Sequence, residues 1–369
     1  MPHVRWLMWL SSVVLLLPGS AARSAPTGPS VKPCLSPLVP ATPERSDDRL
    51  RAAAPPGFLM GTAAGQKPLR EHFAYRETLA HQYASLTPEN ELKWVGTQPR
   101  RGQYSWCSSE ALVQFAELHG MAVRGHTLVW HEQLPDWLTS RRWSKAELTA
   151  ILRDYIHTVV GHYRGRIAQW DVVNEVVGDD GQLRRTLWLD LIGPEYLELA
   201  FRWAHEADPK ARLYLNEYGA EALGAKSDGV LALVRTLRRR GVPIHGVGLQ
   251  MHVDSTAWRG ERDVRANLAR LAAAGVDTAI TEMDVTIDAA SAQAQGPRPG
   301  GPLDRQARTY RTMLDVCLDS PRCVSLTTWG FTDRYSWRAS GLPLVFDRKY
   351  EPKAAYNALL NRLRLGRAG

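Results

Sequence analysis

The chain has 369 residues, of which 44% are hydrophobic and 23% are charged, a composition typical of a globular protein that buries a large core. Its formal charge of +8 would suit a nucleic-acid partner, but the positive residues are scattered, apart from residues 238–240 at the end of an expected helix. We therefore interpret them as solvated surface and expect no nucleic-acid partner.

Residues 1–25 have the layout of a secretory signal peptide. Charge precedes a short apolar run over residues 6–17, and small residues follow at Ser20 and Ala22. A transmembrane anchor would need roughly 20 apolar residues, more than this run offers. We expect a secreted protein, extracellular or periplasmic, that has no contact with the membrane once the signal is removed. Residues 26–54 are rich in Pro, Ser and Thr and predict a flexible or surface-lying segment, with folded structure beginning near Phe58.

Short apolar or β-branched runs alternate with amphipathic helical stretches over residues 55–365. Strands are expected at residues 58–63, 83–87, 122–128, 167–174, 212–217, 246–252, 278–284 and 324–331. A capping box of Ser144 and Glu147 indicates the start of one intervening helix. Eight strand–helix units over roughly 310 residues predict an α/β fold, a (β/α)8 TIM barrel that forms a single catalytic domain. An open doubly wound sheet is disfavoured, because no Gly-rich phosphate loop follows the first strand.

Two glutamates lie at the ends of expected strands, where the reactive residues of such barrels gather. Glu175 follows Asn174, and Glu282 lies two residues before Asp284. Hydrolysis of an acetal needs a proton donor for the leaving oxygen and an anion that faces the developing oxocarbenium carbon, and two carboxyl groups in different environments provide both. His252, with Asp284 behind it, could keep Glu282 charged, which leaves the acid/base role to Glu175.

A metal site is the chemical alternative, since His126, His131 and His252 could converge with carboxylates. The spacing of His126 and His131 across a strand end puts their side chains on opposite faces, and no short-spaced ligand set is present. We therefore expect neither a metal nor a cofactor.

Aromatic and polar side chains near the same strand ends suit a sugar polymer. Trp130, Trp137, Trp329 and Trp337 lie in or near loops at this face, and indole rings stack on the apolar faces of sugars, although such rings can also cap a barrel core. Donors and acceptors for hydroxyl groups are offered by Glu89, Asn90, Lys93, His126 and Gln250, any of which could instead tie loops together.

The sequence resembles glycoside hydrolase family 10, the group dominated by endo-β-1,4-xylanases. The resemblance covers nearly the whole barrel and rests on six motifs in order: TPENELKW from Thr87, GHTLVWH from Gly125, WDVVNE from Trp170, GLQMH from Gly248, TEMD from Thr281, and TWGFTDRYSW from Thr328.

Family roles can be carried over to the matching positions. The resemblance implies a retaining double displacement with Glu175 as acid/base and Glu282 as nucleophile, supported by His252, Asp284 and Asn174. It implies that the non-reducing side of the cut is lined by Glu89, Asn90, Lys93, His126, Trp130, Asn174, Gln250, Trp329 and Trp337, and the reducing side by Asn216 and Tyr218. The segment Asn216-Glu-Tyr-Gly replaces the more usual Asn-Asp-Tyr-Asn, which leaves details of the sugar subsites in doubt.

Four cysteines are compatible with an oxidising compartment. Cys317 and Cys323 are close enough in sequence to form a bridge, the alternative being two buried thiols, and the resemblance strengthens the bridge. For Cys34 and Cys107 the sequence leaves two alternatives open, a second bridge and two free thiols.

The sequence thus predicts a secreted, monomeric endo-xylanase that acts on xylan or xylo-oligosaccharides. Two alternatives stay open: the same mechanism on cellulose or mixed-linkage glucan, and a sugar-binding barrel without catalysis.

Overall fold

The computed structural model describes residues 49–257 and 260–366. By its internal contacts the chain divides into Met1–Pro33 and Cys34–Gly369. The first unit, and with it the expected signal peptide, lies outside the described residues. Within the described part, no helix is both long and apolar enough to span a bilayer.

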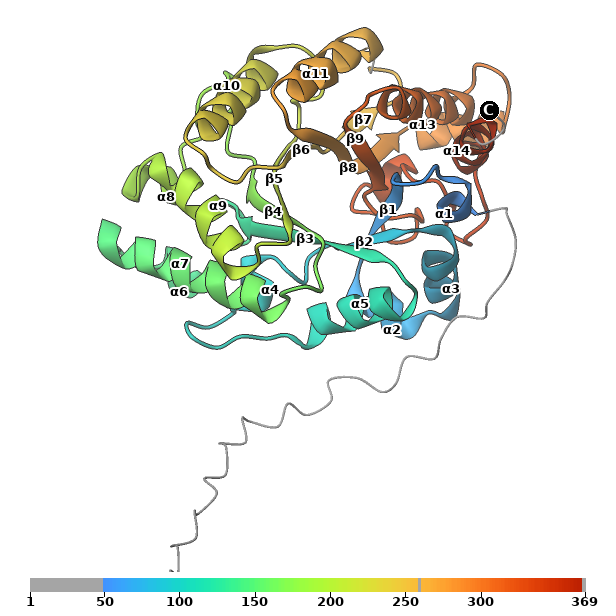
Figure 1. Cartoon of the computed structure of the whole chain (residues 1–369). Coiled ribbons are helices and arrows are strands. Elements are labelled where there is room, and N and C mark those ends of the chain that lie inside the picture. The colour runs from blue at the N-terminus through green and yellow to red at the C-terminus, as the bar shows by residue number, and fades with distance from the viewer. Residues whose placement is uncertain (1–48, 258–259, 367–369) are drawn as a thin grey trace, which may run out of the picture. The chain divides into compact units, whose positions relative to one another are not determined.

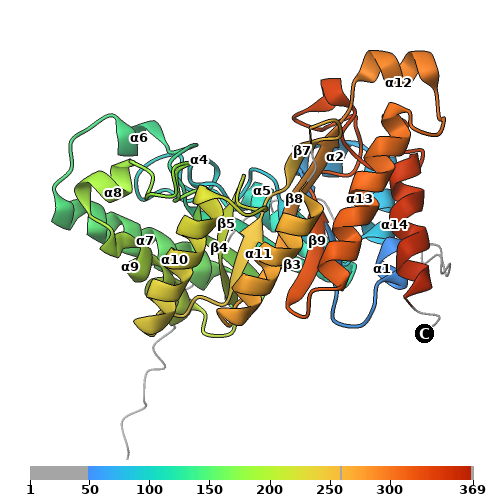
Figure 2. The same cartoon turned by 90° about the horizontal axis from the view of Figure 1, so that it is seen from above.

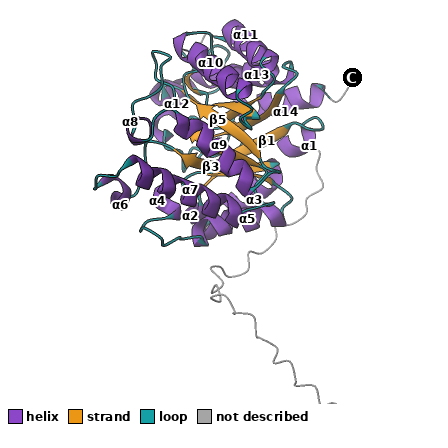
Figure 3. Ribbon diagram, turned by 60° about the vertical axis from the view of Figure 1, so that its left-hand side comes forward, coloured by secondary structure: helices purple, strands orange, loops and turns teal. Residues whose placement is uncertain are grey.

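Parallel strands form a closed barrel at the centre of the second unit, with helices around it (Figures 1 and 3). The strands are β1 (Leu59–Ala64), β2 (Ser85–Pro88), β3 (Ala122–Val129), β4 (Gln169–Asn174), β5 (Arg212–Glu217), β6 (Gly246–Leu249), β7 (His252–Asp254), β8 (Asp277–Thr286) and β9 (Cys323–Thr328). Each of β1 to β5 pairs with the next strand, β6 pairs with β8, β8 with β9, and β9 with β1, which closes the barrel. The short strand β7 pairs with the carboxyl end of β8 and is not a ninth strand of the barrel. The predicted (β/α)8 barrel is confirmed.

Helices cover the outside of the barrel, and Figure 2 shows α10, α11 and α13 following one another along it. The helices are α1 (Leu50–Ala53), α2 (Gln66–Glu71), α3 (Phe73–Gln82), α4 (Trp94–Thr97), α5 (Cys107–Leu118), α6 (Asp136–Thr139), α7 (Lys145–His162), α8 (Leu187–Leu191), α9 (Glu195–Ala207), α10 (Ala225–Arg239), α11 (Glu261–Ala273), α12 (Ala289–Gln295), α13 (Pro302–Leu318) and α14 (Ala354–Leu365). Helix α7 begins at the predicted capping box, where the side chains of Ser144 and Glu147 each bond the other's backbone amide.

The layer between the barrel strands and the surrounding helices is filled by large side chains that require small neighbours. Trp170 on β4 is fully buried, and a Cβ atom at Gly125 of β3 would lie 2.3 Å from its indole ring. Glycine is therefore required at position 125 by the close approach of this ring. Burial of each such large apolar side chain stabilises the fold by about 1.5–3 kcal/mol, so the packing rather than any single polar contact holds the barrel together.

The described fold begins earlier than we expected. Leu50 and Ala53 of α1 are buried, and the guanidinium of Arg51 donates hydrogen bonds to the carbonyl oxygens of Ala80 and Gly120, at 2.9 and 3.0 Å. The expectation that folded structure starts near Phe58 was therefore wrong by one short helix. A single helical turn in a Pro-rich segment is too short to show the periodicity by which longer helices are recognised.

The expected strand over residues 246–252 is divided into β6 and β7. Between them Met251 has φ 66°, a left-handed conformation that residues other than glycine rarely adopt, and its amide donates to Glu221 Oε1 at 2.9 Å. Gln250 and His252, on either side of this break, both reach the cleft at the end of the barrel.

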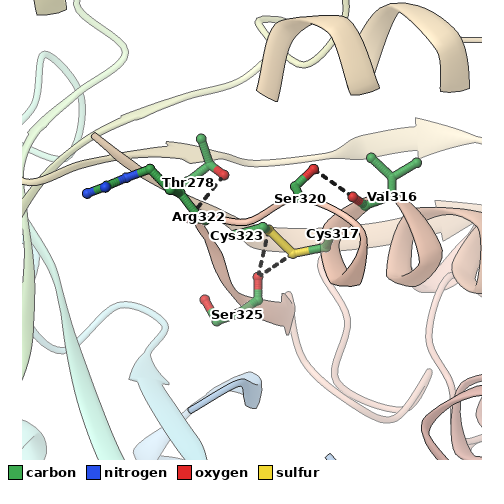
Figure 4. The surroundings of a disulfide bond; sticks show 7 residues. All are labelled: Thr278, Val316, Cys317, Ser320, Arg322, Cys323 and Ser325. Atoms are coloured by element: carbon green, nitrogen blue, oxygen red, sulfur yellow. Dashed lines mark hydrogen bonds between the residues drawn. A yellow bond between two sulfur atoms is a disulfide. The ribbon is translucent and has the colours of Figure 1, made fainter. Parts of the chain in front are cut away.

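The bridge between Cys317 and Cys323 is confirmed, and it joins the end of α13 to the start of β9 (Figure 4). Both residues are buried, and their Cα atoms are 5.2 Å apart. Beside the bridge, the amide of Thr278 donates to the carbonyl oxygen of Arg322 at 2.8 Å, so this turn is also tied to β8. Cys107 is likewise disulfide-bonded, and Cys34 lies outside the described residues.

Candidate active site

A cleft of about 460 Å³ opens at the carboxyl ends of the strands. It is lined by Glu89, Asn90, Lys93, His126, Trp130, Glu132, Gln133, Asn174, Glu175, Tyr218, Gln250, His252, Glu282, Trp329 and Trp337. Of the side chains to which the family resemblance gives a catalytic or sugar-binding role, all but two therefore lie together in one cleft. The two exceptions, Asn216 and Asp284, are fully buried beneath it.

The Glu282 carboxylate is buried and surrounded by donors. Asn216 Nδ2 donates to Oε1 at 2.7 Å, His252 Nε2 lies 3.2 Å from Oε2, and His126 Nδ1 lies 3.9 Å from Oε1. Burial alone would raise the pKa of Glu282. The imidazole of His126 and the hydrogen bonds from His252 and Asn216 outweigh it, so the pKa lies below the ordinary 4.5. Glu282 is therefore an anion throughout the neutral range.

His252 connects Glu282 to a second buried carboxylate. Its Nδ1 lies 2.9 Å from Asp284 Oδ2, and Asp284 also accepts hydrogen bonds from Trp337 Nε1 at 2.8 Å and Arg338 Nη1 at 2.7 Å. Burial lowers the pKa of His252, but its hydrogen bonds to Asp284 and Glu282 raise it to about 10. Since the folded pKa is raised above the usual 6.5, the stabilisation by this imidazolium is complete below pH 6.5 and is lost as the pH rises through about 10.

Glu175 has a different environment. It follows β4 with φ 57°, and its amide donates to the carbonyl oxygen of Asn216 at 2.9 Å. Its two side-chain oxygens accept hydrogen bonds from neutral groups, Trp130 Nε1 at 2.9 Å and Gln250 Nε2 at 3.0 Å. One cleft thus contains a carboxylate held by the His252 imidazolium and an amide, and a carboxyl held by neutral donors alone, the asymmetry that separates a nucleophile from an acid.

Asn174 offers a donor to a ligand. Its Oδ1 accepts from Asn216 Nδ2 at 2.9 Å, whereas its buried Nδ2 has no hydrogen-bond partner although the residue lines the cleft. A sugar hydroxyl is the kind of acceptor that would satisfy it. Asn216 departs from the role expected of it, because its side chain is fully buried and bonded to Asn174, Glu282 and Thr281, so it supports the carboxylate instead of lining a reducing-side subsite.

Lys93 lines the same cleft and is almost fully buried. It is 6% exposed, donates to Asn90 Oδ1 at 2.9 Å, and lies 5.2 Å from the Trp130 ring and 5.9 Å from the Trp329 ring. Burial raises the pKa of the neighbouring Glu89 to about 7. Together these groups present both donors and acceptors to a sugar ring.

The indoles divide between cleft and scaffold. Trp329 meets the His126 ring edge to face at 5.2 Å, and Trp337 is 61% exposed over the cleft. Trp137, which we expected near the active face, does not line the cleft. Its indole donates to the carbonyl oxygen of Gln98 at 3.0 Å and lines a separate pocket.

Several supporting residues were not predicted. His126 Nδ1 lies 3.1 Å from Asp171 Oδ2, and Asp171 is paired with Arg124 in the barrel interior. Arg338 stabilises Asp284, and Arg184 bonds the backbone at Glu175. No sequence signal marks Asp171, Arg124 or Arg338 as supporting residues, although the first lies within a motif that we used and the other two lie directly beside one. Over residues 49–257 and 260–366, no three His, Cys, Asp or Glu side chains converge on a possible metal site.

The pKa of Glu282 gives a prediction about pH. Replacing His252 by alanine removes a positive charge and a hydrogen bond, so the pKa of Glu282 should rise and the acid limb of the kcat/KM profile should move to higher pH. The profile is measured from pH 3 to pH 9 in both proteins. His157→Ala, whose imidazole lies against Glu206 of α9 and does not line the cleft, is the control. An unchanged acid limb in His252→Ala would show that His252 does not keep Glu282 charged.

Comparison with known proteins agrees with this geometry. The sequence model of glycosyl hydrolase family 10 matches residues 49–362. Endo-1,4-beta-xylanase B of Thermotoga neapolitana is 44% identical over 308 residues, which cover 82% of this chain and 86% of that protein. Endo-1,4-beta-xylanase A of Fusarium oxysporum is 36% identical over 295 residues, covering 77% and 88%. The solved structure of xylanase 10B from Thermotoga petrophila in complex with xylobiose is 41% identical and superposes with a TM-score of 0.82 over 86% of this chain and 98% of that one.

The family match extends over most of the described residues, and the identities exceed what a shared fold alone would need. The chain belongs to glycosyl hydrolase family 10 and is a glycoside hydrolase.

Proposed function

We propose that this protein is an endo-acting β-1,4-xylanase that retains configuration at the anomeric carbon, with Glu282 as nucleophile and Glu175 as acid/base. The observation that carries the proposal is the asymmetry of the two carboxyl groups in one cleft. Glu282 accepts a hydrogen bond from the protonated imidazole of His252 as well as one from the Asn216 amide, and it is held charged, whereas Glu175 is bonded by neutral groups alone, an indole and an amide.

In the first step, Glu282 Oε attacks the anomeric carbon of a xylose unit and forms an ester bond to it. The glycosidic C–O bond breaks, and the carboxylic acid of Glu175 transfers its proton to the leaving oxygen. The positive charge that develops on the sugar is stabilised by the Glu282 anion.

In the second step, a water molecule attacks the same carbon. Its proton passes to the Glu175 carboxylate, the ester to Glu282 breaks, and Glu175 is again an acid. Two inversions at one carbon give net retention.

The substrate assignment is supported by the relatives. The curated relatives with 35–44% identity are named endo-1,4-beta-xylanases, and one solved relative holds xylobiose. The cleft offers what a xylose ring requires: exposed indole at Trp337, a donor at Asn174, and the Lys93 ammonium between two indoles. We further propose that residues 1–25, with their signal-peptide layout, direct export and that the enzyme acts as a monomer.

The test measures new reducing ends on xylan, carboxymethyl cellulose and mannan, using protein expressed from residue 26 onward. Release from xylan, and little from the other two polymers, is expected. A rapid fall in the viscosity of xylan would identify internal cleavage. No release from xylan together with activity on another polymer would contradict the substrate assignment but not the reaction. Glu282→Ala with the same activity as the wild-type protein would contradict the mechanism.

A further inference from the structure

The backbone that carries Glu175 turns sharply as it leaves β4. A left-handed conformation at a residue other than glycine persists only where its surroundings hold it. After Glu175 the chain forms a narrow hairpin, in which Val177 pairs with Leu183, and returns to the same place at Arg184.

Arg184 meets both the acid and an aromatic residue of the cleft. Its Nε donates to the carbonyl oxygen of Glu175 at 2.8 Å, and its Nη2 donates to the Tyr218 hydroxyl at 2.9 Å. A planar guanidinium presents these donors in a fixed fork, so it sets the distance between the two groups that it bonds.

Tyr218 is held from its other side by Lys226. The Lys226 ammonium, which is almost fully buried, lies 3.3 Å from the centre of the Tyr218 ring and 3.4 Å from Glu217 Oε2. Glu217 Oε1 in turn accepts a hydrogen bond from the amide of Val177 at 2.8 Å. The hairpin and the tyrosine are thus joined at two points, one through Arg184 and one through Glu217.

We propose that Arg184 is a positioning residue for the departing part of the substrate: it fixes the Glu175 backbone and the Tyr218 ring relative to one another, so that the proton is delivered to a leaving sugar stacked on Tyr218. This inference rests on the proposed role of Glu175 as the acid. Arg184 itself contributes no proton and forms no bond to the substrate.

A leaving group that needs no proton distinguishes this role from general support of the fold. A sugar is a poor leaving group, and protonation of its oxygen contributes about 10²- to 10⁴-fold to the rate. A dinitrophenolate leaves without protonation. A change that misplaces only Glu175 and the Tyr218 ring should therefore slow the cleavage of xylan and hardly affect the cleavage of 2,4-dinitrophenyl β-xylobioside.

The experiment compares kcat/KM for Arg184→Gln and Arg184→Lys on these two substrates. We expect Arg184→Gln to lose roughly 30- to 100-fold on xylan and less than about 3-fold on the dinitrophenyl glycoside, as a small misplacement of a catalytic group predicts. Arg184→Lys, which can bond only one of the two acceptors at a time, should fall between Arg184→Gln and the unchanged protein. Its partial rescue would identify geometry rather than charge.

The neighbouring Arg185 provides the matched control. Its side chain is 83% exposed and pairs with Asp190 on the surface, so Arg185→Gln should leave both activities unchanged. Equal losses on the two substrates in Arg184→Gln, no loss on xylan, or failure of both Arg184 variants to fold would overturn the inference. Failure of the proposed function would be detected by different measurements, namely the activity of the wild-type protein on the three polymers and the activity of Glu175→Ala on xylan.

Discussion

Replacing Glu282 by alanine is expected to reduce the rate of xylan hydrolysis by about 10⁴-fold or more, because the proposed mechanism assigns the covalent bond to the anomeric carbon to this carboxylate. The buried cluster around it is otherwise complete, since His252 still has Asp284 as a partner. Initial rates of reducing-end release at neutral pH measure the effect.

Added azide separates chemical loss from misfolding in this variant. Azide can occupy the space left by the carboxylate and attack from the same face, so an activated β-xylobioside should yield the α-glycosyl azide. Glu206→Ala, which alters an exposed carboxylate on α9, is the control for surface charge. Substantial xylan hydrolysis by pure Glu282→Ala would refute the nucleophile assignment.

Replacing Glu175 by alanine is expected to lower activity on xylan by about 10³-fold while leaving the first step on 2,4-dinitrophenyl β-xylobioside nearly intact. Water then attacks the ester slowly, without a base, so the intermediate accumulates and the apparent KM for the aryl glycoside falls together with kcat. A burst of dinitrophenolate, followed by a slow steady rate, is the signature to measure.

The glycosyl azide formed by Glu175→Ala should have the opposite anomeric configuration to that formed by Glu282→Ala. Here the ester to Glu282 still forms, and azide attacks the opposite face in place of water, which gives the β-glycosyl azide. The two alanine variants should therefore give opposite anomers from one substrate. If both gave the same anomer, the roles of Glu175 and Glu282 would have to be reassigned.

Periodicity was sufficient for the barrel because each strand is a short apolar run between turn signals, and its neighbours in space are its neighbours in sequence. It failed where tertiary contacts decide the backbone. The break at Met251 is one such place, because a methionine carries no preference for positive φ and the conformation is held by Glu221, from a different loop. The helix at Leu50 was missed because one turn has no measurable period.

Cleft residues were identifiable from strand ends, where a polar residue has few structural reasons to occur. The sequence did not show how deeply each of these side chains is buried. Asn216 lies at a strand end like the other cleft residues, and yet its side chain is fully buried. Arg184 was missed for another reason. It lies in a loop nine residues after Glu175 and acts through backbone and tyrosine contacts that exist only in the folded chain.

The exposure of Trp337 gives the protein an optical reporter of its own. Among the tryptophans of residues 49–257 and 260–366 it is the one that is mostly exposed to water, and its indole N–H is fixed to Asp284 at 2.8 Å. A sugar ring stacked on this face would replace water around the indole. Its fluorescence should then move to shorter wavelength when a chain binds, so affinity for uncut xylo-oligosaccharides can be titrated in Glu282→Ala without a label.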